Sequence, residues 1–211
     1  MADFSTDKRV VVGLSGASGT VYGTRLIEVL VRMDFEVHLF VSPSTWKVMA
    51  AELGIEGVSP STPMKEWLAL SQEEIDARVR VYNVRDIAAA PASGTFKSHG
   101  MVVIPASMKT VAAMAHGYAD NLLTRCADCF LKEGRRLIVV PRETPLSLIH
   151  LRNLTLLAEA GARIVPAMPG FYHQPKSLGD IVDFMVMKVL DQLGIEHQFQ
   201  DFVWTGPRGR A

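Results

Sequence analysis

Short runs of apolar, β-branched residues alternate along the chain with longer segments in which apolar residues recur with helical spacing. Such runs at residues 8–14, 36–41, 78–82, 101–104, 137–140 and 163–165 predict strands. Helical periodicity and capping residues predict helices over 20–32, 44–53, 107–116, 121–132, 146–160 and 177–193. Residues 54–72 and 86–99 are rich in Pro, Ser, Ala and Gly, and we expect them to be irregular.

This alternation of strands and helices is typical of a parallel sheet that is covered by helices on both faces. The sequence therefore predicts an α/β fold, a doubly wound, Rossmann-like or flavodoxin-like domain of three layers with a mainly parallel sheet. The 211 residues, 48% of them hydrophobic, fit a single domain spanning residues 1–211. Residues 1–7 and 198–211 are expected to form tails that are flexible or contact other subunits.

Charge and composition exclude several classes of function. The chain has 22 Lys and Arg and 22 Asp and Glu, so bulk charge does not attract it to nucleic acid or to a membrane. No apolar run reaches the roughly 18–20 residues of a membrane span, and the polar start lacks the layout of a signal peptide. We expect a cytoplasmic protein that acts on small molecules.

The turn after the first predicted strand, residues 13–19, has the composition of a phosphate-binding turn. Small residues let backbone amides approach a phosphate, and Ser15 and Ser18 add hydroxyl donors. The glycine spacing misses the dinucleotide pattern, and Ser42 ends the second strand where an acidic residue would hold a ribose, so NAD is disfavoured. A Walker lysine is absent, and Ala17 breaks the G-x-S-x-G pattern of hydrolases. The alternative is a tight turn without a ligand.

Three later segments follow predicted strands and should reach the same edge of the sheet. Ser107 can cap a helix whose amides would face a flavin ring edge or ribityl chain. Arg142 suits phosphate and Glu143 suits proton transfer, with a surface ion pair as the alternative. The turn at 169–175 offers the phenol of Tyr172.

No metal site is expected. Cys126 and Cys129 match C-x-x-C, but they lie in a helical pattern without a second cysteine pair, which favours buried helix cysteines. The six histidines lack metal-ligand spacing, and His38 reads as a core residue of a strand.

Six motifs in order resemble those of the UbiX-type flavin prenyltransferases, a branch of the flavoproteins that also contains flavin-dependent cysteine decarboxylases. They are SGASGTVYG (15–23), APASGTF (90–96), PASMKT (105–110), LLTRCADCFLKE (122–133), PRETPLSLIHLRN (141–153) and PGFYHQPKS (169–177). The resemblance runs from about residue 8 to residue 193.

The resemblance implies a metal-independent reaction in which reduced FMN is a substrate. A dimethylallyl group from dimethylallyl phosphate is joined to N5 and C6, phosphate leaves, and the prenylated FMN serves a separate UbiD-type decarboxylase. The residues implied to hold FMN are Gly16, Ala17, Ser18, Ser42, Ser107, Met108, Lys109, Thr110 and Arg142. Tyr172 and Lys188 are implied to bind the donor, and the implied catalytic residues are Ser18, Glu52, Ser93, Arg125, Lys132 and Glu143.

The resemblance also implies a homo-oligomer, a dodecamer, in which Glu52, Tyr172 and Lys188 serve the flavin of a neighbouring subunit. The chain departs from the family at two positions: Ile87 replaces the tryptophan of some members, and Lys188 replaces a frequent arginine. Lysine keeps the charge but loses the bidentate fork. Trp204 is a candidate to replace the missing aromatic wall. Monophosphate and diphosphate donors both remain open.

Two other functions remain as alternatives. A flavin-dependent cysteine-type decarboxylase would share the fold and the DNLLT segment at 120–124, but its P-x-M-N segment is replaced here by PAMPGFYHQP at 166–175. A non-catalytic FMN carrier would not need Arg142, Glu143, Tyr172 and Lys188 around one edge.

Overall fold

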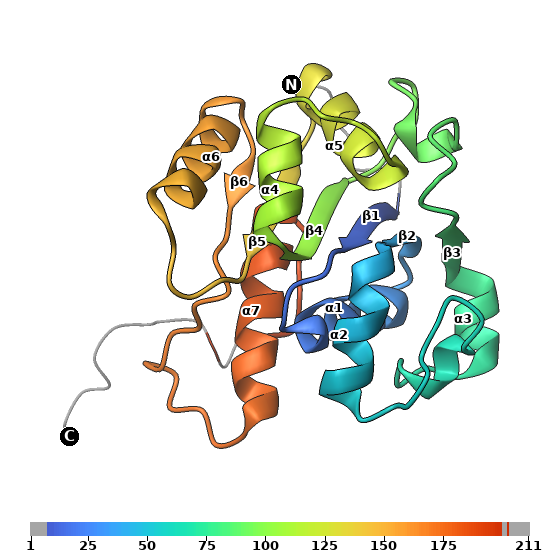
Figure 1. The fold of residues 1–211 in the computed structure, drawn as a ribbon. Coiled ribbons are helices and arrows are strands. Elements are labelled where there is room, and N and C mark those ends of the chain that lie inside the picture. The colour runs from blue at the N-terminus through green and yellow to red at the C-terminus, as the bar shows by residue number, and fades with distance from the viewer. Residues whose placement is uncertain (1–7, 200–201, 203–211) are drawn as a thin grey trace.

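A computed structural model describes residues 8–199 and Phe202, and its centre is a parallel sheet of six strands (Figure 1). The strand order is β3-β2-β1-β4-β5-β6, so the direction of winding reverses between β1 and β4. The strands are β1 (Arg9–Leu14), β2 (Glu36–Val41), β3 (Val79–Tyr82), β4 (Gly100–Ala106), β5 (Leu137–Pro141) and β6 (Arg163–Ile164). This arrangement confirms the predicted doubly wound α/β fold.

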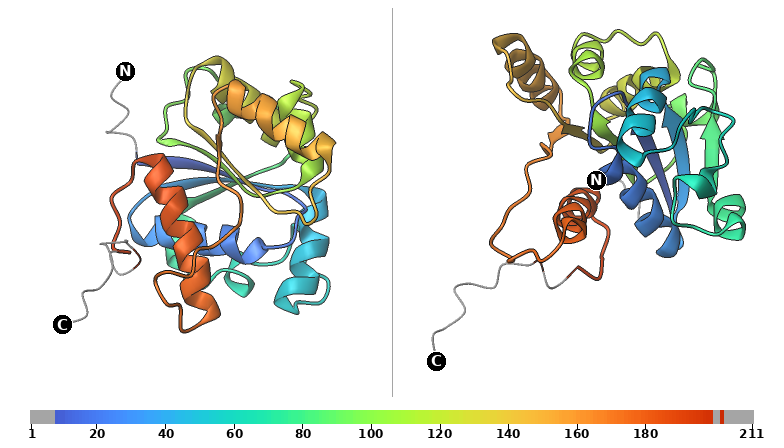
Figure 2. Two further views of the ribbon diagram at one scale, coloured as in Figure 1. Left: turned by 90° about the vertical axis from the view of Figure 1, so that its left-hand side faces the viewer. Right: turned by 60° about the horizontal axis from the view of Figure 1, so that its bottom comes forward.

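Helices cover both faces of the sheet, as the left view of Figure 2 shows. One layer contains α1 (Thr20–Arg32), α2 (Pro43–Leu53), α3 (Gln72–Arg78) and α7 (Leu178–Leu193). The opposite layer contains α4 (Met108–Ala115), α5 (Leu122–Lys132) and α6 (Leu148–Glu159). No helix in the described part is both long and apolar enough to cross a membrane.

The apolar strand runs form the two cores on either side of the sheet. Val10, Val12 and Leu14 of β1 face the layer of α1 and α7, whereas Val11 faces the layer of α4 and α5. All four side chains are fully buried. Continuous apolar strands therefore follow from a parallel sheet that is shielded on both faces.

The structure departs from the predicted elements in the middle of the chain. Helix α3 was not predicted, although its sequence has a capping box: the Ser71 side chain accepts from the Glu74 amide and the Glu74 side chain accepts from the Ser71 amide. Strand β4 continues through Pro105 to Ala106, with a register shift before its end, instead of stopping at Ile104. Two 3₁₀ turns, Met64–Glu66 and Ala90–Ala92, interrupt the irregular segments.

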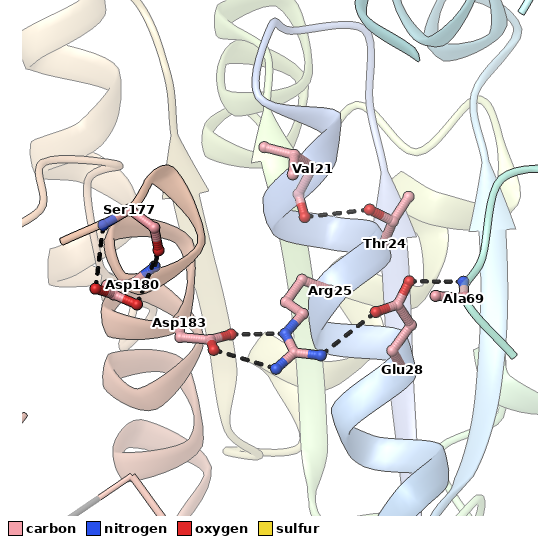
Figure 3. A network of polar contacts seen from close by, with 8 residues as sticks. All are labelled: Val21, Thr24, Arg25, Glu28, Ala69, Ser177, Asp180 and Asp183. Atoms are coloured by element: carbon pink, nitrogen blue, oxygen red, sulfur yellow. Dashed lines mark hydrogen bonds and ion pairs between the residues drawn. The ribbon is translucent and has the colours of Figure 1, made fainter. Parts of the chain in front are cut away.

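A polar network fixes α7 against α1 (Figure 3). Arg25 donates two hydrogen bonds to the Asp183 carboxylate, at 2.6 and 3.1 Å, and also pairs with Glu28 at 3.5 Å. Glu28 in turn accepts a hydrogen bond from the Ala69 amide at 2.8 Å. The bidentate contact gives α7, which carries Lys188, a fixed position on the sheet.

Candidate active site

The ends of β1 and β4, where the strand order reverses, are joined by Ser15. Its buried hydroxyl donates to the Pro105 carbonyl at 2.9 Å and accepts from the Ser107 amide at 2.7 Å. Ser15 is therefore not available to a phosphate, which corrects the role predicted for it. Both of its hydrogen-bonding functions serve to hold the two turns together, at the place where doubly wound sheets bind their ligands.

The turn after β1 packs onto the start of α2. A Cβ atom added at Gly16 would lie 2.3 Å from the Ser44 hydroxyl, so only glycine allows this approach. Ser42 precedes α2, its amide donates to the Leu14 carbonyl at 2.9 Å, and its hydroxyl lies 2.9 Å from that of Thr45. Ala17 is buried beside this contact, and Ser18 is half-buried. Gly16, Ala17, Ser18 and Ser42 thus share one edge of the sheet.

The first amides of α1, where the sequence predicts a phosphate, are bound by Glu52. Its carboxylate accepts from the amides of Gly19 and Thr20 at 2.8 Å each and from the Thr20 hydroxyl at 2.7 Å. The Ser18 side chain also hydrogen-bonds to it. Burial acts to raise the pKa of Glu52, but these hydrogen bonds outweigh it and lower the pKa. Glu52 is therefore an ionised cap of α1, in the same subunit.

The predicted segments at 105–110 and 141–145 also lie at this edge and are held by hydrogen bonds to backbone groups. The Ser107 hydroxyl accepts from the Thr110 amide at 3.3 Å and starts α4, with Met108 buried and Lys109 exposed. The Arg142 amide donates to the Ala106 carbonyl at 3.3 Å. The Cγ atom of the Arg142 side chain lies 3.9 Å from the position that a Cβ atom at Gly19 would occupy. Glu143 accepts from the Thr144 amide at 3.0 Å.

We call the residues at this edge the carboxyl-edge cluster: Gly16, Ala17, Ser18, Ser42, Ser107, Met108, Lys109, Thr110 and Arg142. Each follows the carboxyl end of a parallel strand, and backbone contacts tie the turns of β1, β4 and β5 to one another. The starts of α2 and α4, serine and threonine hydroxyls and one guanidinium are donors that suit the phosphate and ribityl oxygens of a flavin nucleotide.

Tyr172 and Lys188 lie around α7. The Tyr172 ring is half exposed and packs edge-on against Phe184, with ring centres 5.7 Å apart. Lys188 pairs with Asp191 at 2.9 Å and lines a cavity of about 470 Å³ together with Phe184 and Arg163. Arg163 begins β6, and Met168 and Gly170 follow its carboxyl end, so this cavity runs along the whole of β6.

Three further predicted residues belong to the segments around α5. Lys132 ends this helix, which runs back toward the amino edge, and pairs with Glu133 at 3.0 Å. Ser93 lines a cavity of about 440 Å³ with Arg9, the first residue of β1. Arg125 pairs with Asp128 at 3.1 Å. Within one subunit, Ser93 and Lys132 therefore lie at the sheet edge opposite the carboxyl-edge cluster.

The structure also places the residues predicted to have no catalytic role. Cys126 and Cys129 are fully buried on α5, and burial raises the pKa of the Cys126 thiol well above its usual value. His38 is a buried residue of β2 whose Nδ1 lies 2.9 Å from the Tyr82 hydroxyl. At the position of the missing aromatic wall Ile87 is exposed, and Trp204, the candidate to replace that wall, lies outside the described residues.

Tyr22 is a residue of the carboxyl edge that the sequence analysis missed. Its ring lies 3.0 Å from the position that a Gly19 Cβ would occupy, next to the Arg142 side chain. Helical side chains lean toward the amino end of their helix, so a residue three positions after Gly19 covers that glycine. This spacing was a usable signal within SGASGTVYG.

Comparison with known sequences assigns the chain to a family. A family model described as Flavoprotein matches residues 3–190. The chain is 48% identical over 188 residues to a flavin prenyltransferase UbiX of Synechocystis, covering 89% of this chain and 91% of the relative. It is 48% identical over 200 residues to the flavin prenyltransferase LpdB of Lactiplantibacillus plantarum, covering 94% and 99%.

Solved structures agree with this assignment. A dodecameric FMN-dependent UbiX-like decarboxylase of Escherichia coli O157:H7 has a TM-score of 0.80 and 40% identity, over 94% of this chain and all of that one. AnUbiX (PadA1), solved with FMN and dimethylallyl pyrophosphate, has a TM-score of 0.80 and 37% identity, over 95% and 98%. The cysteine decarboxylase TvaF, at 17% identity and a TM-score of 0.58, shares the fold alone.

Proposed function

The chain belongs to the flavoprotein family, and we propose that it is a UbiX-type flavin prenyltransferase that transfers a dimethylallyl group to N5 and C6 of reduced FMN. The observation that carries this proposal is the carboxyl-edge cluster, in which Arg142 stands beside Glu143 at the edge where the turns of β1, β4 and β5 meet. Relatives that match nearly the whole chain are named as flavin prenyltransferases.

The carboxyl-edge cluster would hold FMN through amides at the starts of α2 and α4, the hydroxyls of Ser42 and Ser107, and the Arg142 guanidinium. Reduced FMN supplies the two nucleophilic atoms, N5 and C6. The positive charge of Arg142 would also stabilise the negative charge that develops on the phosphate of the donor as its carbon–oxygen bond breaks. Because N5 and C6 each lose a proton and the donor alkene gains one, a nearby proton carrier is required. We assign this role to Glu143, which is next to Arg142 in the sequence and half-buried.

Ser93, Arg125, Lys132, Tyr172 and Lys188 supply the hydroxyls and positive charges that a prenyl phosphate requires, and Ser93 and Lys132 lie at the opposite sheet edge within one subunit. We propose that a homo-oligomer brings them to the flavin of a neighbouring subunit. A structurally similar relative is dodecameric, which supports an assembly of that size. The prenylated FMN would then serve a UbiD-type decarboxylase.

Mass spectrometry of the flavin tests the activity directly. Purified protein, given reduced FMN and dimethylallyl monophosphate without oxygen, should return a flavin heavier by one prenyl group, and a parallel reaction with the diphosphate identifies the donor. Glu143→Gln should bind FMN normally and form at least roughly a hundredfold less product. Unchanged FMN with both donors would contradict prenyl transfer and favour an FMN carrier.

A further inference from the structure

Tyr22, in the first turn of α1, is a phenol that the function described above leaves without a role. Its ring is partly buried against the core, with Cδ2 and Cε2 3.0 and 3.1 Å from the point where a Gly19 Cβ would stand. Gly19 has a φ of +97°, and the missing Cβ makes room for the ring. The phenol is thereby held at the carboxyl edge, over the turn that follows β1.

The charged neighbours of Tyr22 belong to the candidate site. The Arg142 side chain approaches the same Gly19 position to 3.9 Å, so the tyrosine ring and the arginine stem flank one glycine. The Glu52 carboxylate is bound to the Gly19 amide. Burial raises the pKa of the Tyr22 phenol; the charge of Arg142 acts against this shift and that of Glu52 adds to it. At neutral pH the phenol is therefore a hydrogen-bond donor.

The hydroxyl of Tyr22 has no hydrogen-bond partner among residues 8–199 and Phe202. Glu52, the nearby acceptor, already receives hydrogen bonds from Gly19, Thr20 and Ser18. Packing against the core requires only the ring, which phenylalanine would provide equally well. The hydroxyl and the Arg142 guanidinium are thus two donors whose side chains flank Gly19.

We propose that Tyr22 is a further binding residue of the site, whose hydroxyl donates a hydrogen bond to the phosphate oxyanion that Arg142 neutralises. This inference rests on the proposed binding of phosphate esters at the carboxyl edge. The oxyanion belongs either to the phosphate of FMN or to that of the prenyl donor. FMN is a phosphate monoester and the prenyl donor is a monophosphate or a diphosphate ester, so the two ligands offer the same kind of oxygen. Separate binding and kinetic measurements distinguish them.

Tyr22→Phe removes the hydroxyl and keeps the ring, and Tyr118→Phe, at an exposed tyrosine after α4, is the matched control. The dissociation constants of FMN and riboflavin are measured by flavin fluorescence, and the KM of dimethylallyl phosphate by product mass. If the oxyanion is that of FMN, Tyr22→Phe weakens FMN binding roughly tenfold and leaves riboflavin binding unchanged. If it is that of the donor, the KM rises by a similar factor and FMN binding is unchanged.

Two results would overturn the inference. Unchanged FMN binding and unchanged KM would make Tyr22 a packing residue, and equal weakening of FMN and riboflavin would place the hydroxyl on the flavin ring or the ribityl chain. The melting temperature of Tyr22→Phe should match that of wild type, which excludes a folding defect. If wild type binds FMN but forms no product, prenyl transfer fails and the donor arm fails with it, and the comparison of FMN with riboflavin then decides whether Tyr22 binds the phosphate of FMN.

Discussion

The two edges of the sheet hold their polar groups in different ways. At the carboxyl edge, Ser15 and Ser107 are tied to backbone groups, and these bonds fix the turns before any ligand arrives. At the amino edge, Lys132 is paired with an exposed glutamate on the protein surface, and Arg9 pairs with Glu36 at 3.9 Å. Exposed pairs contribute little stability, so their cations can change partners easily.

This difference indicates how one chain can serve two phosphate-bearing substrates. The carboxyl edge is preorganised within each subunit, because its geometry follows from strand ends and helix caps. The amino edge has charges that a second subunit could use. If the site is shared in this way, a subunit contributes half of each of two different sites.

Complementation between damaged subunits is the largest effect that this comparison predicts. Arg142→Ala and Lys132→Ala should each lose nearly all activity, because each removes one half of every shared site. Mixed oligomers of the two variants should regain about a quarter of wild-type product, since random pairing leaves that share of sites with both groups intact. The flavin product is quantified by mass spectrometry after co-expression.

A second mixture is the control for shared sites. Arg142→Ala mixed with Glu143→Gln should stay nearly inactive, because both changes affect the carboxyl edge of the same subunit and every flavin site lacks one of the two groups. If the mixture of Arg142→Ala with Lys132→Ala also stays inactive, Lys132 does not act on a neighbouring flavin. The two edges would then have separate functions.

A smaller effect is expected where the carboxyl edge alone is disturbed. Gly16→Ala places a methyl group 2.3 Å from the Ser44 hydroxyl, so the turn or the start of α2 must move. FMN binding should weaken by at least roughly tenfold, because displaced amides lose hydrogen bonds to the ligand. Isothermal titration with FMN measures the change.

Gly179→Ala is the matched control for this substitution. A Cβ atom at Gly179 meets its nearest neighbour, the Ser177 hydroxyl, at an ordinary 3.4 Å, so FMN binding should stay at the wild-type level. Equal FMN affinity in Gly16→Ala and wild type would show that the turn after β1 does not contact the flavin.

The sequence predicted the framework of the carboxyl edge better than the contacts inside it. Strand runs and capping serines such as Ser107 carry strong local signals, because burial and helix starts depend on neighbouring residues. Glu52 carries no such signal: it reaches the start of α1 from the end of α2, across 32 residues. Likewise, nothing local distinguishes Ser15, which binds a strand end 90 residues away, from a serine that is free for a ligand.

The missed helix α3 and the scattered site residues have different causes. The capping box of Ser71 and Glu74 is a local signal for the start of α3. The helix has only seven residues and follows a Pro- and Ser-rich segment, so the sequence pattern indicated an irregular region instead. The positions of Ser93 and Lys132 depend on which end of a strand or helix each occupies. A family motif names such residues without saying which subunit's site they enter.

The smallest expected effect is on how the free energy of unfolding depends on pH, through Glu52 at the carboxyl edge and His38 in β2. The pKa of Glu52, at the carboxyl edge, and the pKa of His38, within β2, are both lowered. Burial is the main cause for His38: the charge of Glu36 opposes the shift, and the charges of Arg9 and Arg80 add to it. A lowered pKa in the folded state means that the unfolded chain binds more protons, so stability falls as the pH falls. For His38 this loss begins below about pH 6.5, and for Glu52 below about pH 4.5.

Urea unfolding between pH 7.5 and pH 3.5 resolves the two contributions. From pH 7 to pH 5.5 wild type should lose up to about 1 kcal/mol, and His38→Asn, which keeps a polar atom near Tyr82, should flatten this part of the curve. Glu52→Gln should leave that part unchanged and reduce the loss below pH 4.5, with a lower stability of about 1 kcal/mol at neutral pH from the weaker cap. If Glu52→Gln flattened the curve above pH 5.5 instead, the carboxyl edge would titrate near neutrality, and its cap could not be the fixed, ionised group on which the comparison of the two edges depends.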